Sequence, residues 1–305
     1  FVGANWYGGV SLQPTTDGGY IIAGSNEDEW NHTNDGPLLF KIDPQGNEVW
    51  EKIFIEDIFN IGWDSNLGGA YSVLPTTDGG YILTGNVCTQ MSSNGWLIKT
   101  DSEGHEIWGK SLADSKGQKL AAIQDWDLVS YQVAYSMQET SDGEYILAGE
   151  RTYLDEEGGL GEKSDVDFWL AKFDAEGNEL WNRTYGEPGS IEIAYSVQPT
   201  IDGGFIISGT KNLTTSQDST HQMSYNPDIS NSDAWIIKTD AKGNEIWNKT
   251  FGGIRDDFAN SIQLTPDGGY ILAGSTMSFG KGSINAWLLK IDSNGNTAEH
   301  PDLEG

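Results

Sequence analysis

One motif occurs five times in this 305-residue chain: Thr or Ser, any residue, Asp-Gly-Gly and then an aromatic residue, with small variations between copies. The copies centre on Asp17, Asp78, Asp142, Asp202 and Asp267, which are 61, 64, 60 and 65 residues apart. A repeat of this period indicates similar supersecondary units, none of which buries its apolar surface alone. The fold is therefore best predicted from one repeat.

The second copy illustrates the plan. Short β-rich segments begin at Ala70, Tyr81, Trp96 and Glu106, and Asp-Gly or Glu-Gly turn signals separate the first from the second and the third from the fourth. Aromatic and β-branched residues between such turns favour antiparallel strands, and no helical period competes with them. Each repeat is therefore predicted to form four antiparallel strands.

A Trp in the predicted fourth strand ends the motif of each of the first four repeats and is called the closing Trp. In the first four copies it follows the third-strand Asp by seven residues, with one Gly between them, as in Asp101, Gly104 and Trp108. This spacing is typical of a tight hairpin in which Gly adopts a left-handed backbone conformation.

These features predict an all-β fold, a five-bladed β-propeller with four antiparallel strands per blade, as one domain over residues 1–305. A β-solenoid is the competing architecture. The fifth copy lacks its closing Trp around residues 295–299, and residues 1–3 match the end of a fourth strand. Two alternatives remain open: the ends of the chain complete one blade together, or the chain is part of a longer protein.

Composition restricts the partners. The net charge is −29, which disfavours nucleic acid and anionic lipid surfaces. No apolar run is long enough to cross a bilayer. Cys88 is the one cysteine, so no intrachain disulfide is expected, and it is interpreted as a small apolar residue rather than a reactive thiol.

The segments Asp-Gly-Gly-Tyr, Trp-Leu-Ile-Lys-Thr-Asp and Gly-Asn-Glu-x-Trp resemble a propeller repeat of secreted and cell-surface proteins of archaea and bacteria, over essentially the whole chain. The resemblance implies an extracellular or cell-surface location and carries no agreed catalytic residues. The Gly-Asn-Glu-x-Trp hairpin is also distantly similar to quinone-dependent (PQQ) propellers. Those enzymes often carry a vicinal disulfide that one cysteine cannot make, so no cofactor of that kind is expected.

A binding face is expected where the connections vary. In a four-stranded antiparallel unit the first-to-second and third-to-fourth turns share one end, and these turns are short here. The other two connections share the opposite end and vary widely in length, which favours that end as a functional surface. Four Trp residues outside the repeat pattern map to those connections and are predicted to bind ligand: Trp6, Trp30, Trp63 and Trp126. Burial of these rings within their own loops is the alternative.

Acidic residues crowd the same connections. Asp155, Glu156, Asp165 and Asp167 in the third repeat form a candidate Ca²⁺ site, since Ca²⁺ prefers several oxygen ligands, although a solvated acidic loop explains them as well. No other cofactor is expected. Four glycosylation sequons occur, at Asn31, Asn182, Asn212 and Asn248, a number expected by chance.

The functional hypothesis is a non-catalytic recognition or structural module, binding a glycan or a surface protein on the variable face, with self-association as a further form. The alternative is a glycoside hydrolase. Such chemistry needs two carboxylates near the central tunnel, and Asp64, Glu192 and Asp257 precede first strands that would line it. The four scattered His residues lack metal-ligand spacing.

Overall fold

A computed structural model describes residues 5–28, 36–54, 68–88, 93–112, 130–153, 166–188, 190–212 and 232–297. The chain forms two compact units. The first comprises Phe1–Met137 with Ala175–Glu179, and the second comprises Gln138–Asp174 with Leu180–Gly305. Every regular element in the described residues is a β-strand, which confirms the all-β prediction.

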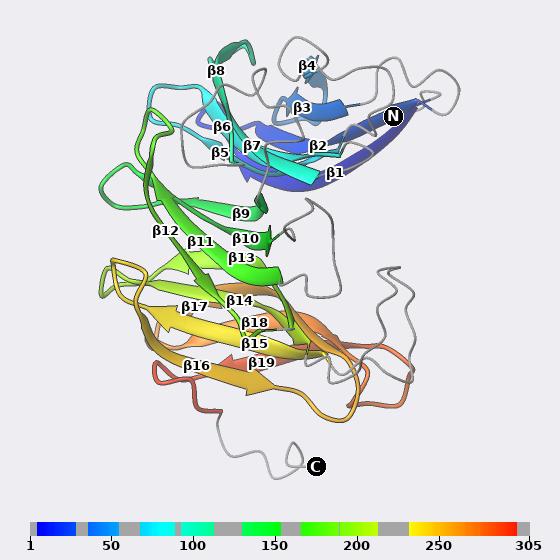
Figure 1. Cartoon of the computed structure of the whole chain (residues 1–305). Helices are drawn as coiled ribbons and strands as arrows, with labels where there is room; N and C mark the ends of the chain where they lie inside the picture. The colour runs from blue at the N-terminus through cyan, green and yellow to red at the C-terminus, as the bar shows by residue number, and fades with distance from the viewer. Residues whose placement is uncertain are drawn as a thin grey trace. The chain divides into compact units, whose positions relative to one another are not determined.

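Nineteen strands occur in the described part of the chain, in repeat order (Figure 1). The first two repeats contribute β1 (Asn5–Pro14), β2 (Tyr20–Asp28), β3 (Gly36–Ile42), β4 (Glu48–Ile53), β5 (Ala70–Pro75), β6 (Tyr81–Cys88), β7 (Ser93–Thr100) and β8 (Glu106–Ser111). The third and fourth contribute β9 (Ser130–Glu139), β10 (Tyr145–Tyr153), β11 (Val166–Phe173), β12 (Glu179–Tyr185), β13 (Ile191–Pro199), β14 (Phe205–Asn212), β15 (Ser232–Thr239) and β16 (Glu245–Phe251). The fifth contributes β17 (Asp257–Leu264), β18 (Tyr270–Thr276) and β19 (Asn285–Ile291).

Strands pair in sequence order within each repeat. The orders β1-β2-β3-β4 and β5-β6-β7-β8 form separate four-stranded sheets. The strands of the third and fourth repeats follow the same order and share one sheet path through a parallel bridge between Val166 and Ile191. The fifth repeat has three strands, and Thr297 makes an antiparallel bridge to Ile291 where a fourth strand would start. Four antiparallel strands per repeat are thus confirmed for four copies, and the stacked rungs of a solenoid are absent from the described strands.

The register of the first two strands aligns the repeats. In the second repeat Ala70 pairs with Gly85 and is followed by a β-bulge. The corresponding pairs, each followed by the same irregularity, are Gly9 with Gly24, Ala194 with Gly209, and Ala259 with Gly274. A bulge at a fixed place re-aims the side chains around it in the same way in every copy. Residues can therefore be compared between repeats by their distance from this pair.

The short turn between the first two strands of each repeat is tied to the third strand by a Lys. In the second repeat Lys99 Nζ contacts Asp78 Oδ1 at 2.8 Å, and the Thr76 hydroxyl donates to the same carboxylate at 2.6 Å. The other copies pair Lys41 with Asp17, Lys172 with Asp142, Lys238 with Asp202, and Lys290 with Asp267. The repeated Asp therefore both forms the turn and neutralises a Lys.

The hairpin between the third and fourth strands links each repeat to the preceding one. Gly104 has a φ of 79°, as predicted, and a β-carbon there would lie 2.8 Å from the ring of Trp50 in the first repeat. The same stacking joins Gly177 to Trp108, Gly243 to Trp181, and Gly295 to Trp247. The closing Trp of one repeat therefore covers the turn Gly of the next, which explains why that position lacks a side chain.

The cores lie between neighbouring sheets. In the first unit, Leu39 and Leu83 are fully buried with Trp96. In the second, one cluster contains Leu170 and Trp235, and another contains Ile236 and Leu272. The third-strand residues Trp96, Trp169 and Trp235 are core residues, since they are at most 5% exposed. The closing Trp residues are instead half-buried over turn glycines.

Candidate functional site

Ionisable side chains gather at one end of the strands in the second unit. The first strand of a repeat starts, the second ends and the third starts at this end, opposite the two short turns. Asp167 is near the start of β11, Glu192 near the start of β13, and Lys211 near the end of β14. Asp233 and Asp257 hold the starts of β15 and β17. Cross-strand pairing places Glu192 opposite Lys211, and Lys211 opposite Asp233. We call the four acids Asp167, Glu192, Asp233 and Asp257 the carboxylate row.

Glu192 is the most buried acid of the third-to-fourth junction, with no exposed surface. Its Oε1 atom accepts a hydrogen bond from the Ser190 hydroxyl and lies 4.0 Å from Lys211 Nζ. The same Nζ forms an ion pair with Glu187 at 2.7 Å. The other oxygen, Oε2, has no hydrogen-bond donor in the described residues. Burial, reinforced by the charge of Asp167, raises the pKa of Glu192 to about 7 against the opposing effects of Ser190 and Lys211.

Gly186 explains how Asp167 and Glu192 approach each other. A β-carbon at Gly186 would lie 2.0 Å from Asp167 Oδ1 and 3.0 Å from Glu192 Oε2. The two carboxylate oxygens are therefore within about 5 Å of one another, over a backbone position where no side chain fits.

The junction between the fourth and fifth repeats has the same geometry. A β-carbon at Gly252 would lie 2.0 Å from Asp233 Oδ1 and 2.9 Å from Asp257 Oδ2. Asp257 has no exposed surface, and its Oδ2 accepts from the Gly253 amide and the Ser278 hydroxyl. Burial, followed by the charges of Asp257 and Asp256, raises the pKa of Asp233 to about 6.

The other repeats carry different residues at these positions. Counted from the bulge pair, Gly68 of the second repeat corresponds to Glu192, and the sequence around Gln132 aligns it there in the third. Asn94 of the second repeat corresponds to Asp167 and Asp233, because each lies two residues before the third-strand Trp. The acid pair is therefore confined to the two junctions of the second unit.

The predicted catalytic set needs correction on this basis. Asp64 lies outside the described residues, and the residue that corresponds to Glu192 in its repeat is Gly68. Glu192 and Asp257 lie within the first strands rather than before them. Each faces its own partner, Asp167 or Asp233, across a glycine. The sequence analysis assigned Asp167 to a calcium site and did not single out Asp233, although the constant distance of both residues from the third-strand Trp was a usable signal.

The predicted aromatic ligand residues are mostly beyond what the structure describes. Trp30, Trp63 and Trp126 lie outside the described residues. The backbone of Trp6 is part of β1 and pairs with Glu27, so the prediction that it lies in a loop is wrong.

Of the four predicted calcium ligands, only Asp167 lies within the described residues. Asp155, Glu156 and Asp165 lie outside the described residues, while Asp167 belongs to the carboxylate row. The described residues contain no cluster of three or more His, Cys, Asp or Glu side chains that could hold a metal ion.

Three of the four sequons can be placed. Asn182 is half-buried on β12, and Asn212 is the half-buried last residue of β14, while Asn31 lies outside the described residues. Asn248 on β16 is exposed, but its side chain donates to Glu245 at 2.6 Å and accepts from the Trp235 indole at 3.2 Å. A glycan on Asn248 would alter both contacts. In the described segments no helix could cross a membrane.

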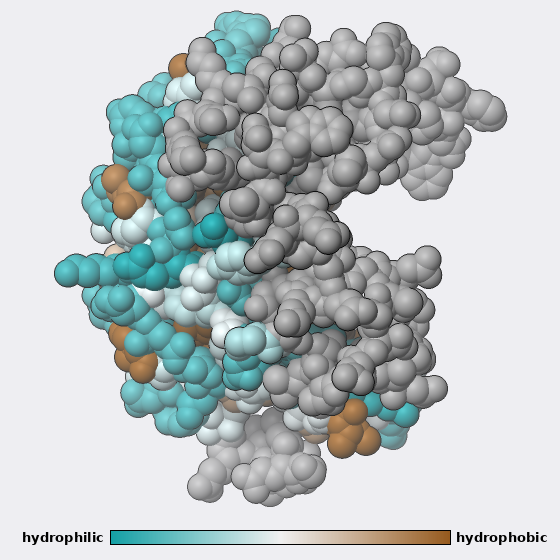
Figure 2. Space-filling view, in the orientation of Figure 1, coloured by the Kyte–Doolittle hydropathy of each residue, from teal (hydrophilic) through white to brown (hydrophobic). Residues whose placement is uncertain are grey.

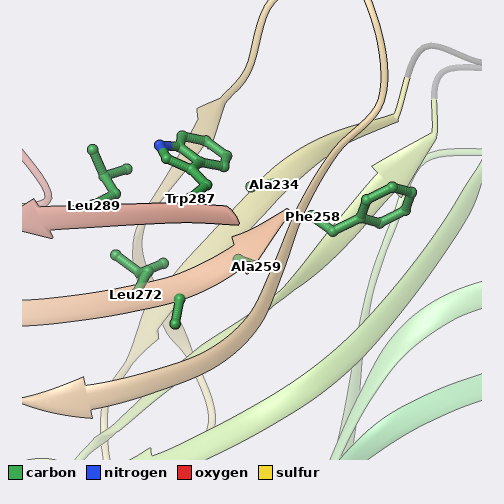
Figure 3. Close-up of a pocket in the computed structure, with 8 residues that line it drawn as sticks. Ala234, Phe258, Ala259, Leu272, Trp287 and Leu289 are labelled. Carbon is green, nitrogen blue, oxygen red and sulfur yellow. The ribbon is translucent and has the colours of Figure 1, made fainter. Parts of the chain in front are cut away.

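A small apolar pocket lies in the fifth repeat (Figure 3). Leu272, Trp287 and Leu289 line it together with Phe258, Gly274 and three alanines. Because it offers no polar group to orient a ligand, it is a packing gap rather than a second site. The surface on the side seen in Figure 2 is mainly hydrophilic where described, with isolated apolar residues.

No protein-family model and no curated protein matches this sequence. Solved structures do match. An α-L-arabinanase of Penicillium chrysogenum, complexed with arabinobiose, has a TM-score of 0.56 at 10% identity, over 93% of this chain and 77% of the enzyme. A protein of unknown function from Dyadobacter fermentans has a TM-score of 0.55 at 12% identity, over 95% of this chain and 80% of its own. A puromycin hydrolase scores 0.51 at 12% identity over 95% of this chain and 38% of that enzyme. At these identities the similarity concerns the fold.

Proposed function

We propose that the five repeats are the blades of a five-bladed β-propeller and that this propeller binds carbohydrate. The observation that carries the architecture is the stacking of a closing Trp on the next turn Gly at four successive junctions, since a constant step between four-stranded sheets is what radial repetition requires. The similarity in fold to an arabinanase that was solved with a sugar bound supports the ligand class.

The binding face would be the end of the sheets that carries the carboxylate row and the long connections. The carboxylate row supplies polar oxygens in the second unit, and the sequence contains Trp30 and Trp126 in connections of the same kind in other repeats. Polar oxygens and aromatic rings suit a sugar, which presents hydroxyl donors and apolar ring faces. An extracellular or cell-surface location, as for the repeat family that the sequence resembles, belongs to the same proposal. A surface protein as ligand, self-association and bound calcium stay sequence predictions.

Glycan binding is testable directly. Purified protein would be screened against a glycan array that includes arabino-oligosaccharides, alongside Trp30→Ala and Trp126→Ala. Loss of one stacking ring is expected to weaken binding by about tenfold, or roughly 1.4 kcal/mol. Ile201→Ala is the control, because Ile201 is exposed on a short turn at the opposite end of its sheet. Absence of glycan binding, or equal binding by all variants, would contradict the proposal.

A second candidate, glycoside hydrolysis, is favoured by the pair of Asp167 and Glu192. Their oxygens are at most about 5 Å apart, which does not exceed the separation of about 5–5.5 Å typical of retaining enzymes. A carboxyl with a pKa of about 7 can hold the proton that a leaving sugar requires. The complete burial of Glu192 places this candidate second, because substrate must reach a catalytic acid.

Turnover separates the two candidates. Release of reducing sugar from an array-positive glycan by the wild type, reduced about 100-fold in Glu192→Gln, would establish hydrolysis. Glu187→Gln is the matched control, since Glu187 contacts the same Lys211 but is largely exposed. Binding without turnover would leave the recognition function alone.

A further inference from the structure

The junction of the fourth and fifth repeats contains three neighbouring Asp residues to which the proposed function assigns no role. Asp233, Asp256 and Asp257 lie together, and Asp256 and Asp257 are almost fully buried. Asp256 accepts from the Ser232 amide at 3.0 Å. Asp233 Oδ1 and Asp257 Oδ1 are buried without a hydrogen-bond donor in the described residues. Buried carboxylates in this state are strongly unfavourable unless something neutralises them.

Among the described residues, no Lys or Arg nitrogen is paired with Asp233 or Asp257. Lys211, opposite Asp233 on β14, directs its Nζ to Glu187 at 2.7 Å and lies 4.9 Å from the Trp235 ring centre. From the other side, Asp257 faces the Ser278 hydroxyl and the Gly253 amide, while Arg255 contacts Ser278 through its backbone. The hydrogen-bonding partners of Asp257 in the described part of the chain are therefore neutral groups.

A metal ion fits poorly here. Ca²⁺ takes six to eight oxygen ligands, whereas the described residues hold no cluster of three candidate ligand side chains. A proton needs only two facing carboxylates, and Gly252 lets Asp233 and Asp257 approach to within about 5 Å. Two like charges at such a distance resolve their repulsion by retaining one proton between them.

We propose that Asp233 holds a proton against the facing Asp257 carboxylate, and that loss of this proton loosens the junction between the fourth and fifth repeats. The proton leaves to solvent, and the half-buried Asp233 carboxylate then repels the buried Asp257 carboxylate at the start of β15 and β17. The raised pKa of Asp233, about 6, agrees with this geometry. The junction is a pH-sensitive device at the end of the sheets where ligand would bind.

The sign follows from the raised pKa. In the unfolded chain Asp233 loses its proton near the ordinary value of 3.8, whereas the folded protein keeps it to about pH 6. The folded state thus binds more protons between these values, so stability falls as pH rises from about 4 to 6 and then levels off.

Asp233→Asn tests the proposal, because the amide donates a permanent N–H to Asp257 and needs no proton. Thermal unfolding of wild type and variant would be followed from pH 4.5 to 8. The melting temperature of the wild type is expected to fall relative to the variant by several degrees across the window, so that the variant is the more stable protein at pH 8. Asp202→Asn is the control, since Asp202 has a pKa lowered to about 2 and titrates below this window.

A constant difference between Asp233→Asn and wild type would overturn the proposal. So would a rise in the wild-type melting temperature on adding Ca²⁺ at pH 8 that Asp233→Asn lacks, since a metal ion would then occupy the pair. A carboxyl ¹³C titration of the wild type needs no variant: one buried Asp titrating near pH 6 is expected, and titration of every Asp below pH 5 would refute the assignment.

Discussion

Two junctions between repeats carry different polar residues at corresponding positions. At the second-to-third junction, in the first unit, Asn94 and Gln132 hold the positions that Asp233 and Asp257 hold at the fourth-to-fifth junction, in the second. Amides carry their own N–H donors and no charge, whereas two carboxyls can make the equivalent contact only by keeping a proton. Corresponding strand positions thus carry amides at a junction that we expect to be indifferent to pH, and carboxyls at one that we expect to depend on it.

The largest effect is expected where the glycine is lost. Gly252→Ala would place a methyl group 2.0 Å from Asp233 Oδ1 and is expected to destabilise the protein by about 2–3 kcal/mol. Adding Asp233→Ala should recover part of this loss by making room. Urea unfolding of both single variants and the double variant measures the coupling. Additive losses would show that the carboxylate does not sit over the glycine.

Converting the amide junction into an acidic one should transfer the pH dependence. The double variant Asn94→Asp with Gln132→Glu is expected to lose more stability at pH 8 than at pH 5, by about 1.4 kcal/mol for each unit by which burial raises the pKa of the new acid. Chemical denaturation at both pH values checks this. Asn94→Ser with Gln132→Ser, which carries no titrating group, should lose equal stability at both, and equal losses by the acidic variant would break the comparison.

The smallest effect concerns the Lys–Asp contacts that all repeats share. Lys238→Met is expected to cost about 1 kcal/mol, since the Lys238 side chain is 5% exposed but its partner Asp202 faces solvent. Lys290→Met should cost less, because Lys290 is 42% exposed. The Lys238 contribution should vanish as pH falls from about 4 to 2, where Asp202 with its lowered pKa gains a proton. Thermal unfolding at pH 7 and pH 2.5 measures both, and equal losses for the two variants would contradict the expectation.

The strands of each repeat were predictable, because their signals are local. Turn residues at fixed spacing and alternating apolar residues define β5 to β8 within a few residues of the observed bounds. The left-handed turn at Gly104 was predictable from the spacing between Asp101 and Trp108. The stacking of that glycine on Trp50 was not, since it joins different repeats.

The carboxylate row was only partly predictable, for a physical reason. Asp233 and Asp257 are 24 residues apart, and in an acidic sequence each resembles an ordinary solvated residue. Only cross-strand register shows that they face each other over Gly252. The prediction for Asp64 stays open, because Asp64 lies outside the described residues; connections of unequal length precede each first strand, so its position in the chain does not give its position in the sheet.

The stacking of a closing Trp on the hairpin glycine of the next module bears on how the number of modules can change during evolution. Since each of the first four modules places an aromatic side chain over the hairpin glycine of its successor, an internal module of about 60 residues can be gained or lost while the same contact is kept at its two junctions. The free energy of unfolding is then approximately a sum of terms for each module and for each pair of adjacent modules. A substitution that disrupts one hairpin is therefore expected to destabilise the adjacent module first.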